Sequence, residues 1–251
     1  MKNILNKKLI QRYSRQIILK DVGPIGQKKI MNSKVLVVGA GGLGCPVIDY
    51  LSRAGVGNIG IVDNDKVNIS NIHRQSLYNS KDVGEFKVNS VKEKIKLINP
   101  KVKIKTFKER ISKKNIEKIF KSYDVIVDGS DNFKTKFLLN KYCLNQKKIL
   151  IVGAISKMDG HIFTFDFKNK NNPCLKCFYQ TEPSDDILNC EYEGILGPVA
   201  GVVGNIQAIE VLKKILKIGD KSSKKILILD LSKLDFRRVE FKKKTSCICK
   251  K

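Results

Sequence analysis

Residues 34–44 read KVLVVGAGGLG, a short apolar run that leads directly into a glycine-rich GxGxxG turn. Residues 47–54 then carry the apolar spacing of a helix, so the turn joins a strand to a helix. Glycines at such a turn let a phosphate approach backbone N–H groups at the helix N-terminus, where the helix dipole favours negative charge. Asp63 follows 19 residues after Gly44, at the end of the next strand, where a carboxylate can accept hydrogen bonds from ribose hydroxyls. Together these features predict a nucleotide site.

The chain around this turn alternates between strand and helix patterns. Strand-like runs occupy residues 59–62, 102–107, 125–128 and 149–152, and helical spacing occupies residues 86–98, 115–121 and 133–146. After Gly153 the pattern changes to a long apolar helix at 199–216 and to antiparallel or edge strands at 161–167, 225–231 and 236–241. We therefore expect a single α/β domain over residues 1–251. Its Rossmann-like, doubly wound, mainly parallel sheet would be extended by antiparallel strands in the C-terminal part.

The composition is that of a globular protein with a strong basic excess. Of the 251 residues, 42% are hydrophobic and 29% are charged, with 49 Lys plus Arg against 24 Asp plus Glu. The basic residues are 42 Lys and 7 Arg, spread along every expected helix, which favours a solvated lysine-rich surface over a specific nucleic-acid face. No uninterrupted apolar run reaches the roughly 18 residues that a membrane-spanning helix needs. We expect a cytoplasmic protein without a specific nucleic-acid or membrane partner.

The seven cysteines fall into two close pairs and three single positions. An odd count, with no signal-peptide pattern at the N-terminus, favours a reducing compartment, where paired cysteines hold metal more often than they form disulfides. Cys45 and Cys143 lie in expected helices, and we expect them to be buried. The remaining five cysteines are the CxxC pair Cys174 and Cys177, the CxC pair Cys247 and Cys249, and the single Cys190.

The glycine turn and Asp63 fit an NAD-dependent dehydrogenase as well as an ATP-using enzyme. The residues that follow favour ATP, because the cations Arg74 and Lys87 and the carboxylate of Asp131 are expected at the strand edge where open α/β sheets bind ligands. Two cations and a carboxylate suit a triphosphate with a metal ion. A hydride-transfer site does not need them. The dehydrogenase stays as an alternative from another enzyme class, and a basic nucleic-acid-binding module as a further one.

A series of longer motifs supports the ATP interpretation. In chain order they are RYSRQI at 12–17, GAGGLG at 39–44, DxD at 63–65, SNxxRQ at 70–75, Lys87, DxxDN at 128–132, CxxC at 174–177 and CxxxGxxxP at 190–198. In their order and spacing they resemble the ThiF/MoeB/HesA family, bacterial relatives of ubiquitin-activating enzymes, from Arg12 to Cys249. The resemblance implies ATP- and Mg²⁺-dependent adenylylation of the C-terminal Gly-Gly carboxylate of a ubiquitin-like sulfur carrier protein.

The resemblance also implies roles for individual residues. Asn71, Arg74 and Lys87 would contact phosphates. Asp131 would position Mg²⁺, and Arg15 would reach a phosphate of the neighbouring subunit in a homodimer. No general base is expected, because the attacking carboxylate is already ionised. The full nucleotide-binding set would be Gly39, Gly41, Gly42, Gly44, Asp63, Asp65, Asn71, Arg74, Gln75, Lys87, Asp131 and Asn132.

The resemblance divides the chain into a nucleotide-binding half, residues 1–153, and a carrier-binding and zinc half, residues 154–251. Four thiolates suit tetrahedral Zn²⁺, although the CxC of this chain is shorter than the second CxxC of relatives. Cys190 is a candidate for a covalent acyl-persulfide link with the carrier, although the acidic residues around it disfavour a thiolate. The implied structural zinc ligands are Cys174, Cys177, Cys247 and Cys249.

Two sulfur carriers fit the sequence. Residues 190–198, CEYEGILGP, resemble the branch that serves thiazole synthesis for thiamine, whereas residues 157–160, KMDG, resemble the molybdopterin branch. The thiazole carrier is slightly preferred, and the carrier of molybdopterin synthase is the alternative. A sulfur-donating desulfurase or rhodanese is a further expected partner.

Overall fold

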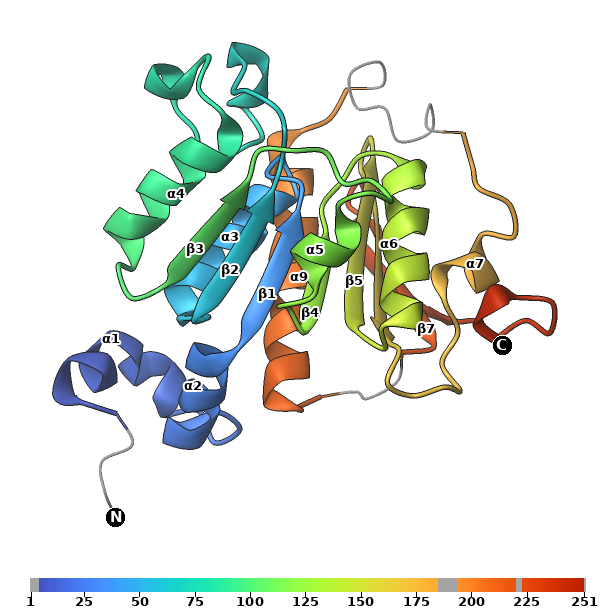
Figure 1. Ribbon diagram of the computed structural model, residues 1–251, viewed down its shortest axis with the longest axis horizontal. Helices are drawn as coiled ribbons and strands as arrows, with labels where there is room; N and C mark the ends of the chain where they lie inside the picture. The colour runs from blue at the N-terminus through green and yellow to red at the C-terminus, as the bar shows by residue number, and fades with distance from the viewer. Residues whose placement is uncertain (1–4, 185–193, 220–222, 251) are drawn as a thin grey trace.

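Eight strands form one sheet in the residues that the computed structural model describes, which are 5–184, 194–219 and 223–250 (Figure 1). The strand order is β3-β2-β1-β4-β5-β6-β7-β8. The first five strands along the chain pair in parallel, and the pairs β5–β6, β6–β7 and β7–β8 are antiparallel, which confirms the predicted fold class. The strands are β1 (Lys34–Val38), β2 (Asn58–Val62), β3 (Lys103–Phe107), β4 (Val125–Asp128), β5 (Ile149–Ser156), β6 (Asp159–Asp166), β7 (Lys225–Asp230) and β8 (Asp235–Glu240).

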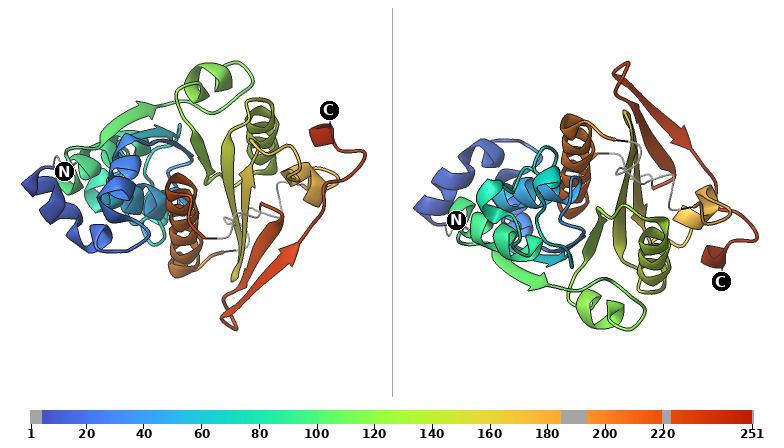
Figure 2. Two further views of the ribbon diagram at one scale, coloured as in Figure 1. Left: turned by 90° about the horizontal axis from the view of Figure 1, so that it is seen from below. Right: turned by 90° about the horizontal axis from the view of Figure 1, so that it is seen from above.

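Helices cover both faces of the sheet (Figure 2). One face carries α3 (Gly44–Ala54), α4 (Lys87–Ile98) and α9 (Gly197–Leu216). The other carries α5 (Ile116–Phe120), α6 (Phe133–Asn145) and α7 (Leu175–Phe178). Because both faces are covered, central strands such as β4 read as continuous apolar runs instead of alternating ones. Three short 3-10 helices also occur among the described residues: η1 (Ile69–Asn71), η2 (Ser80–Asp82) and η4 (Ile248–Lys250).

The two faces of the sheet hold separate hydrophobic cores. Val35 and Val37 of β1 pack into the core under α3, α4 and α9, whereas Leu36 of the same strand packs into the core under α5 and α6. Cys45 lies in the first core and Cys143 in the second, both fully buried. The prediction that these two single cysteines are core residues is confirmed.

Two helices that the sequence analysis did not predict precede β1, namely α1 (Lys7–Ile17) and α2 (Gly23–Asn32). They lie at the starting ends of the parallel strands (Figure 1). Tyr13 anchors α1, because its side chain is buried and its hydroxyl accepts a hydrogen bond of 2.9 Å from Asn99 Nδ2. Gln16 Nε2 also donates to the Ala54 carbonyl at 3.2 Å. Apart from Tyr13, α1 buries no residue fully, although Leu9, Tyr13 and Ile17 follow the apolar spacing of a helix.

Most element boundaries fall within a few residues of those expected, and two of the differences have a clear physical reason. β5 runs to Ser156, beyond the predicted end at residue 152, because its last residues pair with β6 in a hairpin that sets Ser156 opposite Asp159. α9 starts at Gly197 instead of residue 199, with Pro198 in the first turn, where a missing N–H is tolerated. Across residues 5–184, 194–219 and 223–250, no helix combines the length and the apolar content that crossing a membrane requires.

Candidate functional site

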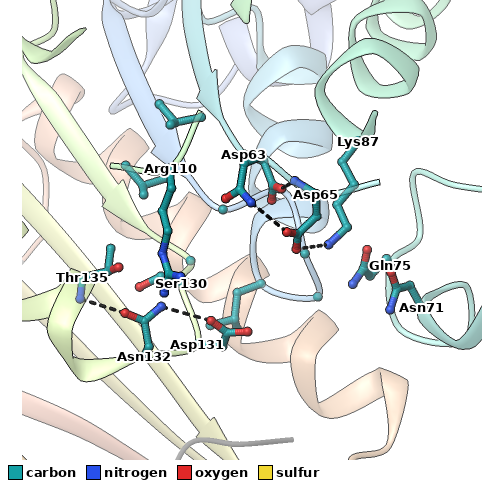
Figure 3. A pocket seen from close by; sticks show the side chains of 18 of the residues that line it. Asp63, Asp65, Asn71, Gln75, Lys87, Arg110, Ser130, Asp131, Asn132 and Thr135 are labelled. Carbon is teal, nitrogen blue, oxygen red and sulfur yellow. Dashed lines mark hydrogen bonds and ion pairs between the residues drawn. The ribbon is translucent and has the colours of Figure 1, made fainter. Parts of the chain in front are cut away.

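A pocket of about 630 Å³ opens at the carboxyl ends of the parallel strands (Figure 3). It lies at β1 and β4, where the strand order reverses, which is the position at which open α/β sheets bind ligands. The predicted nucleotide-binding residues that line it are Gly39, Gly41, Gly42, Asp63, Asp65, Asn71, Arg74, Gln75, Lys87, Asp131 and Asn132.

The glycine turn owes two of its glycines to close packing. Gly39 has a φ of +91°, and a Cβ there would lie 2.7 Å from the Gly129 carbonyl oxygen. Gly44 does not line the pocket, but a Cβ on it would lie 1.9 Å from the Gly39 carbonyl oxygen. Gly41 differs, because the nearest atom to its added Cβ is Gln75 Nε2 at 3.7 Å. Gly39 and Gly44 therefore fix the turn, whereas Gly41 presents open backbone to the pocket.

The peptide of Ala40 inside this turn is held on both sides. Its N–H donates to Asp63 Oδ2 at 2.7 Å, and its carbonyl accepts from the Tyr78 hydroxyl at 2.8 Å and from the Cys45 thiol at 3.4 Å. Burial raises the pKa of the Cys45 thiol to about 12, so this thiol is a protonated donor. Asp63 Oδ1 accepts from the Asp65 N–H at 2.8 Å. Asp63 thus holds the glycine turn with one carboxylate oxygen and the loop after β2 with the other.

The side of the pocket that carries Asp63 holds both negative and positive side chains. Burial raises the pKa of the Asp63 carboxyl, and the positive charge of Lys87 opposes that rise. Lys87 is itself nearly buried, and its Nζ lies 2.9 Å from Asp65 Oδ2, whose side chain is 58% exposed. Arg74 donates from Nη1 to the Ser70 carbonyl and to His73 Nε2, each at 2.9 Å. The two cations are therefore held in place by local partners beside the pocket.

Two amide side chains at the pocket differ in their hydrogen bonding: the side-chain oxygen of Asn71 has a partner, and that of Gln75 does not. Asn71 Oδ1 accepts from the N–H of Asn68, the N-cap of η1, at 3.2 Å and completes a capping box, so Asn71 shapes the loop that carries Arg74. Gln75 is 3% exposed and lines the pocket, and its Oε1 has no hydrogen-bond partner among the described residues. Because buried polar atoms are normally paired, the Gln75 amide indicates room for a polar ligand on this wall.

Asp131 and Asn132 form part of the opposite wall (Figure 3). Asn132 Oδ1 accepts from the Thr135 N–H at 2.8 Å and caps α6, while its Nδ2 donates to Asp131 Oδ1 at 3.2 Å. The Asp131 side chain is exposed to the pocket. Carboxylate oxygens suit Mg²⁺, which is usually held by one or two carboxylates together with substrate phosphates. The residues present therefore fit a Mg²⁺–nucleotide complex.

Two charged residues of one loop are among the pocket residues that the sequence analysis missed. Glu109 and Arg110 follow β3 and line the pocket, and the Arg110 guanidinium extends toward Ser130 and Asn132 (Figure 3). The Asn115 amide steadies this loop by donating to Glu109 Oε2 at 2.6 Å and to the Arg110 carbonyl at 2.9 Å. Their position directly after a parallel strand was the available signal, because carboxyl ends of parallel strands share one edge.

Arg15 lies elsewhere. It is an exposed residue of α1, which packs at the starting ends of the strands, whereas the pocket lies at the opposite ends (Figure 1). Arg15 does not line the pocket of its own chain. Any contact between Arg15 and a nucleotide therefore requires a second subunit.

The four paired cysteines come together at the far end of the sheet, where α7 and the C-terminal turn lie side by side (Figures 1 and 2). All four sulfur atoms lie within 4.8 Å of one another and are buried. Cys174 Sγ is 3.5 Å from Cys247 Sγ, and Cys177 Sγ is 3.3 Å from Cys249 Sγ. Four sulfurs around Zn²⁺, each at about 2.3 Å, would lie roughly 3.8 Å apart, so the cluster fits a tetrahedral metal. Cys190 lies outside the described residues.

Named relatives match nearly the whole chain. Adenylyltransferase and sulfurtransferase MOCS3 of Drosophila virilis is 40% identical over 241 residues, covering 96% of this chain and 53% of the relative. Sulfur carrier protein adenylyltransferase of Thermus thermophilus is 38% identical over 245 residues, covering 96% of this chain and 90% of the relative. Probable molybdopterin-synthase adenylyltransferase of Gracilaria tenuistipitata var. liui is 38% identical over 228 residues, covering 91% and 64%. The chain spans about half the length of the MOCS3 relatives that it matches.

Similarity to solved structures supports the fold. The crystal structure of E. coli MccB with ATP has a TM-score of 0.83 and 23% sequence identity, and it covers 99% of this chain and 76% of that chain. At this identity the likeness shows the fold alone. The profile of the ThiF family matches residues 13–250, from Tyr13 of α1 to the C-terminal cysteines. With this match, and with relatives near 40% identity along its length, the chain belongs to the ThiF family.

Proposed function

We propose that this protein uses ATP and Mg²⁺ to adenylylate the C-terminal Gly-Gly carboxylate of a ubiquitin-like sulfur carrier protein. The observation that carries the proposal is the pocket at the reversal of strand order, where an open glycine turn faces two cations and an exposed carboxylate. The name of the Thermus relative, of which the chain covers 90%, supports the same activity.

The chemistry follows from the residues around the pocket. The carrier carboxylate attacks the α-phosphorus of ATP, a new O–P bond forms, the bond to the bridging oxygen breaks, and pyrophosphate leaves. Arg74 and Lys87 stabilise the negative charge that spreads over the phosphates, and Asp131 would hold Mg²⁺ near them. Bound Mg²⁺ supplies further neutralisation of that charge. Lys87 already pairs with Asp65, so a phosphate would share or replace that partner.

Of the two carriers considered, we now prefer the carrier of molybdopterin synthase. The slight preference for the thiazole carrier rests on residues 190–198, of which 190–193 lie outside the described part. The names of the Gracilaria and Drosophila relatives favour the molybdopterin alternative. The sulfurtransferase part of the Drosophila name belongs to a protein nearly twice as long, so our proposal covers adenylylation alone, with a desulfurase or rhodanese as a separate sulfur donor.

We further propose a homodimer in which Arg15 completes the partner's pocket. Apolar side chains that follow Arg15, in the turn between α1 and α2 and in α2 itself, are exposed in the single chain, with Ile18 71%, Leu19 56% and Ile25 63% exposed. The long helix α9 is apolar around most of its circumference, yet its Ile209 is 54% exposed. Exposed apolar surface beside a cation needed at another subunit's site supports an interface there. We also propose structural Zn²⁺ on the four clustered cysteines.

The experiment is carrier-dependent exchange between ATP and radiolabelled pyrophosphate. We expect exchange with a Gly-Gly carrier and none when the two glycines are deleted from it. Parallel assays with thiazole and molybdopterin carriers from the native cell would identify the pathway. Calorimetry should give binding of ATP with Mg²⁺ and no binding of NAD, and tight binding of NAD without binding of ATP would eliminate the proposal.

A further inference from the structure

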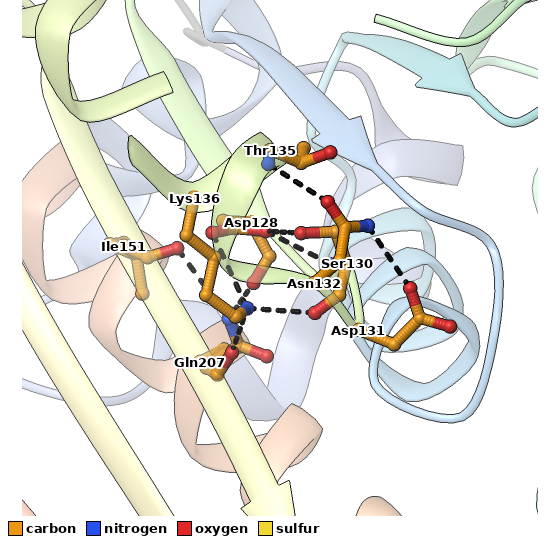
Figure 4. Close-up of polar contacts among 9 residues, drawn as sticks. Asp128, Ser130, Asp131, Asn132, Thr135, Lys136, Ile151 and Gln207 are labelled. Carbon is orange, nitrogen blue, oxygen red and sulfur yellow. Dashed lines mark hydrogen bonds and ion pairs between the residues drawn. The ribbon is translucent and has the colours of Figure 1, made fainter. Parts of the chain in front are cut away.

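Lys136, a residue without an assigned role, is buried directly behind the pocket wall that carries Asp131 (Figure 4). Its side chain is 1% exposed. The ammonium donates to the Ser130 carbonyl at 2.7 Å and to the Gly153 carbonyl at 2.6 Å, and it lies 3.4 Å from Asp128 Oδ2. An ammonium group has three N–H donors, so these three acceptors use its full hydrogen-bonding capacity.

The three acceptors belong to two neighbouring strand ends. Asp128 ends β4 and Ser130 follows it, while Gly153 belongs to β5, immediately before the pocket residues Ala154 and Ile155. Lys136 itself is on α6, one turn after its N-terminus. It therefore ties together the helix, the loop at residues 129–132 and the neighbouring strand, all of which form one side of the pocket.

The loop is also fixed by the other contacts of Asp128. Asp128 Oδ1 accepts from the Ser130 N–H at 3.0 Å and from its hydroxyl at 2.6 Å, and Gln207 of α9 donates to the Asp128 carbonyl at 2.9 Å. Burial raises the pKa of the Asp128 carboxyl, and Lys136 opposes that rise. With both oxygens occupied by Ser130 and Lys136, the buried Asp128 side chain anchors the loop from within the protein (Figure 4).

A buried ion pair is weak evidence for stability by itself, because an apolar pair of similar volume is often as stable. The Lys136–Asp128 pair lies behind the pocket wall, however, so it can also affect the nucleotide site. From it, we infer that Lys136 is a positioning residue of the nucleotide site, which acts through the loop at residues 129–132 to present the Asp131 carboxylate to Mg²⁺. This inference rests on the proposed function, since it requires a Mg²⁺–ATP complex in the pocket.

The test compares four variants with the wild type. Lys136→Met leaves Asp128 buried without its cation and should lower the thermal midpoint. Lys136→Met combined with Asp128→Asn removes both charges and should recover much of that midpoint. Lys136→Arg keeps the charge and should largely preserve binding. Lys141→Met, at an exposed position of the same helix, is the matched control and should behave like the wild type.

The decisive measurement is calorimetric ATP affinity with and without Mg²⁺. In the double variant we expect the gain in affinity on adding Mg²⁺ to fall by about tenfold or more and exchange turnover to fall on the order of 100-fold, as for a misplaced group. Affinity for ATP without Mg²⁺ should change little. Adding Asp131→Ala should have little further effect on the Mg²⁺ gain, since both changes remove one interaction.

Two outcomes would overturn the inference. The first is a double variant with a recovered midpoint and a wild-type Mg²⁺ gain, which would make Lys136 purely structural. The second is the absence of any temperature at which the double variant keeps its native circular dichroism, since the role would then be in folding. A different result, in which the wild-type protein binds no Mg²⁺–ATP, would contradict the proposed function and therefore this inference as well.

Discussion

Gly41→Ala should separate nucleotide binding from folding. Gly41 lines the pocket, its φ lies outside the left-handed range, and a Cβ there would meet no atom closer than Gln75 Nε2 at 3.7 Å. The methyl group therefore fits the folded chain. It does not fit the ligand, because close approach of phosphate to the backbone of the turn is what the glycine allows.

Both magnitudes can be estimated. Glycine-to-alanine changes at compatible positions stabilise by about 0.4–1 kcal/mol through the unfolded state. In a domain of this size that shifts the thermal midpoint upward by only about 1–4 °C. Losing one backbone hydrogen bond to a charged phosphate costs about 1.5–3 kcal/mol, which weakens binding of ATP roughly 10- to 100-fold. Affinity and stability should therefore move in opposite directions.

The assay is paired calorimetry with Mg²⁺–ATP and thermal unfolding, with two other glycines as references. Gly44→Ala would place a Cβ 1.9 Å from the Gly39 carbonyl oxygen, so it should destabilise the fold by about 3 kcal/mol or more. Gly201→Ala, within α9, meets no atom within 4 Å, so it should raise the thermal midpoint by a similar small amount and leave ATP affinity unchanged. Wild-type ATP affinity in a folded Gly41→Ala protein would refute a phosphate site at this turn.

Three further predictions follow from the site. Asp131→Ala should abolish carrier-dependent exchange at saturating Mg²⁺ while the thermal midpoint stays near that of the wild type, since the residue is exposed. Arg15→Ala should also be inactive alone, but subunit exchange between the two variants should recover about a quarter of wild-type activity if the site is shared, and none if Arg15 acts within its own chain. Metal analysis should give about one zinc per chain, and Cys177→Ser should lose it and unfold at a lower temperature, whereas protein purified without chelator and lacking zinc would contradict the site.

The strands and the glycine turn were predictable because their signals are local. The run KVLVV is buried on both faces of β1, and the glycines follow it at once. The helix α1 was missed although its signal is local too, because Leu9, Tyr13 and Ile17 recur every four residues along it and the sequence analysis did not use that spacing. Arg110 was missed for a different reason. No glycine turn marks the loop after β3, and its place in the pocket depends on strand order, which local patterns do not encode.

The cysteine cluster shows the limit of sequence reasoning more sharply. The CxxC and CxC patterns mark candidate ligands, but Cys174 and Cys247 are 73 positions apart, and their meeting depends on the fold between them. β7 and β8 form an antiparallel hairpin, and the chain leaves β8 and returns to α7. Because β7 pairs with β6, this geometry is set by the same sheet that carries the pocket. Loss of the metal site should therefore disturb the C-terminal strands before it disturbs the glycine turn.

The contacts of Asp63 change how substitutions at the site should be interpreted. The sequence suggests a carboxylate that binds ribose, but both its oxygens already accept backbone N–H groups, from Ala40 and Asp65. Removing the carboxylate would therefore leave two N–H groups unpaired and loosen the glycine turn, whether or not a ribose is bound. Loss of ATP affinity in Asp63→Ala would not by itself identify a ribose contact. A ribose contact can be identified by comparing the affinities of wild-type and Asp63→Asn protein for ATP and for 2′- and 3′-deoxy-ATP. If Asp63 contacts the ribose directly, the loss of affinity on removing a hydroxyl should disappear in the variant. If Asp63 acts through the turn, that loss should stay unchanged.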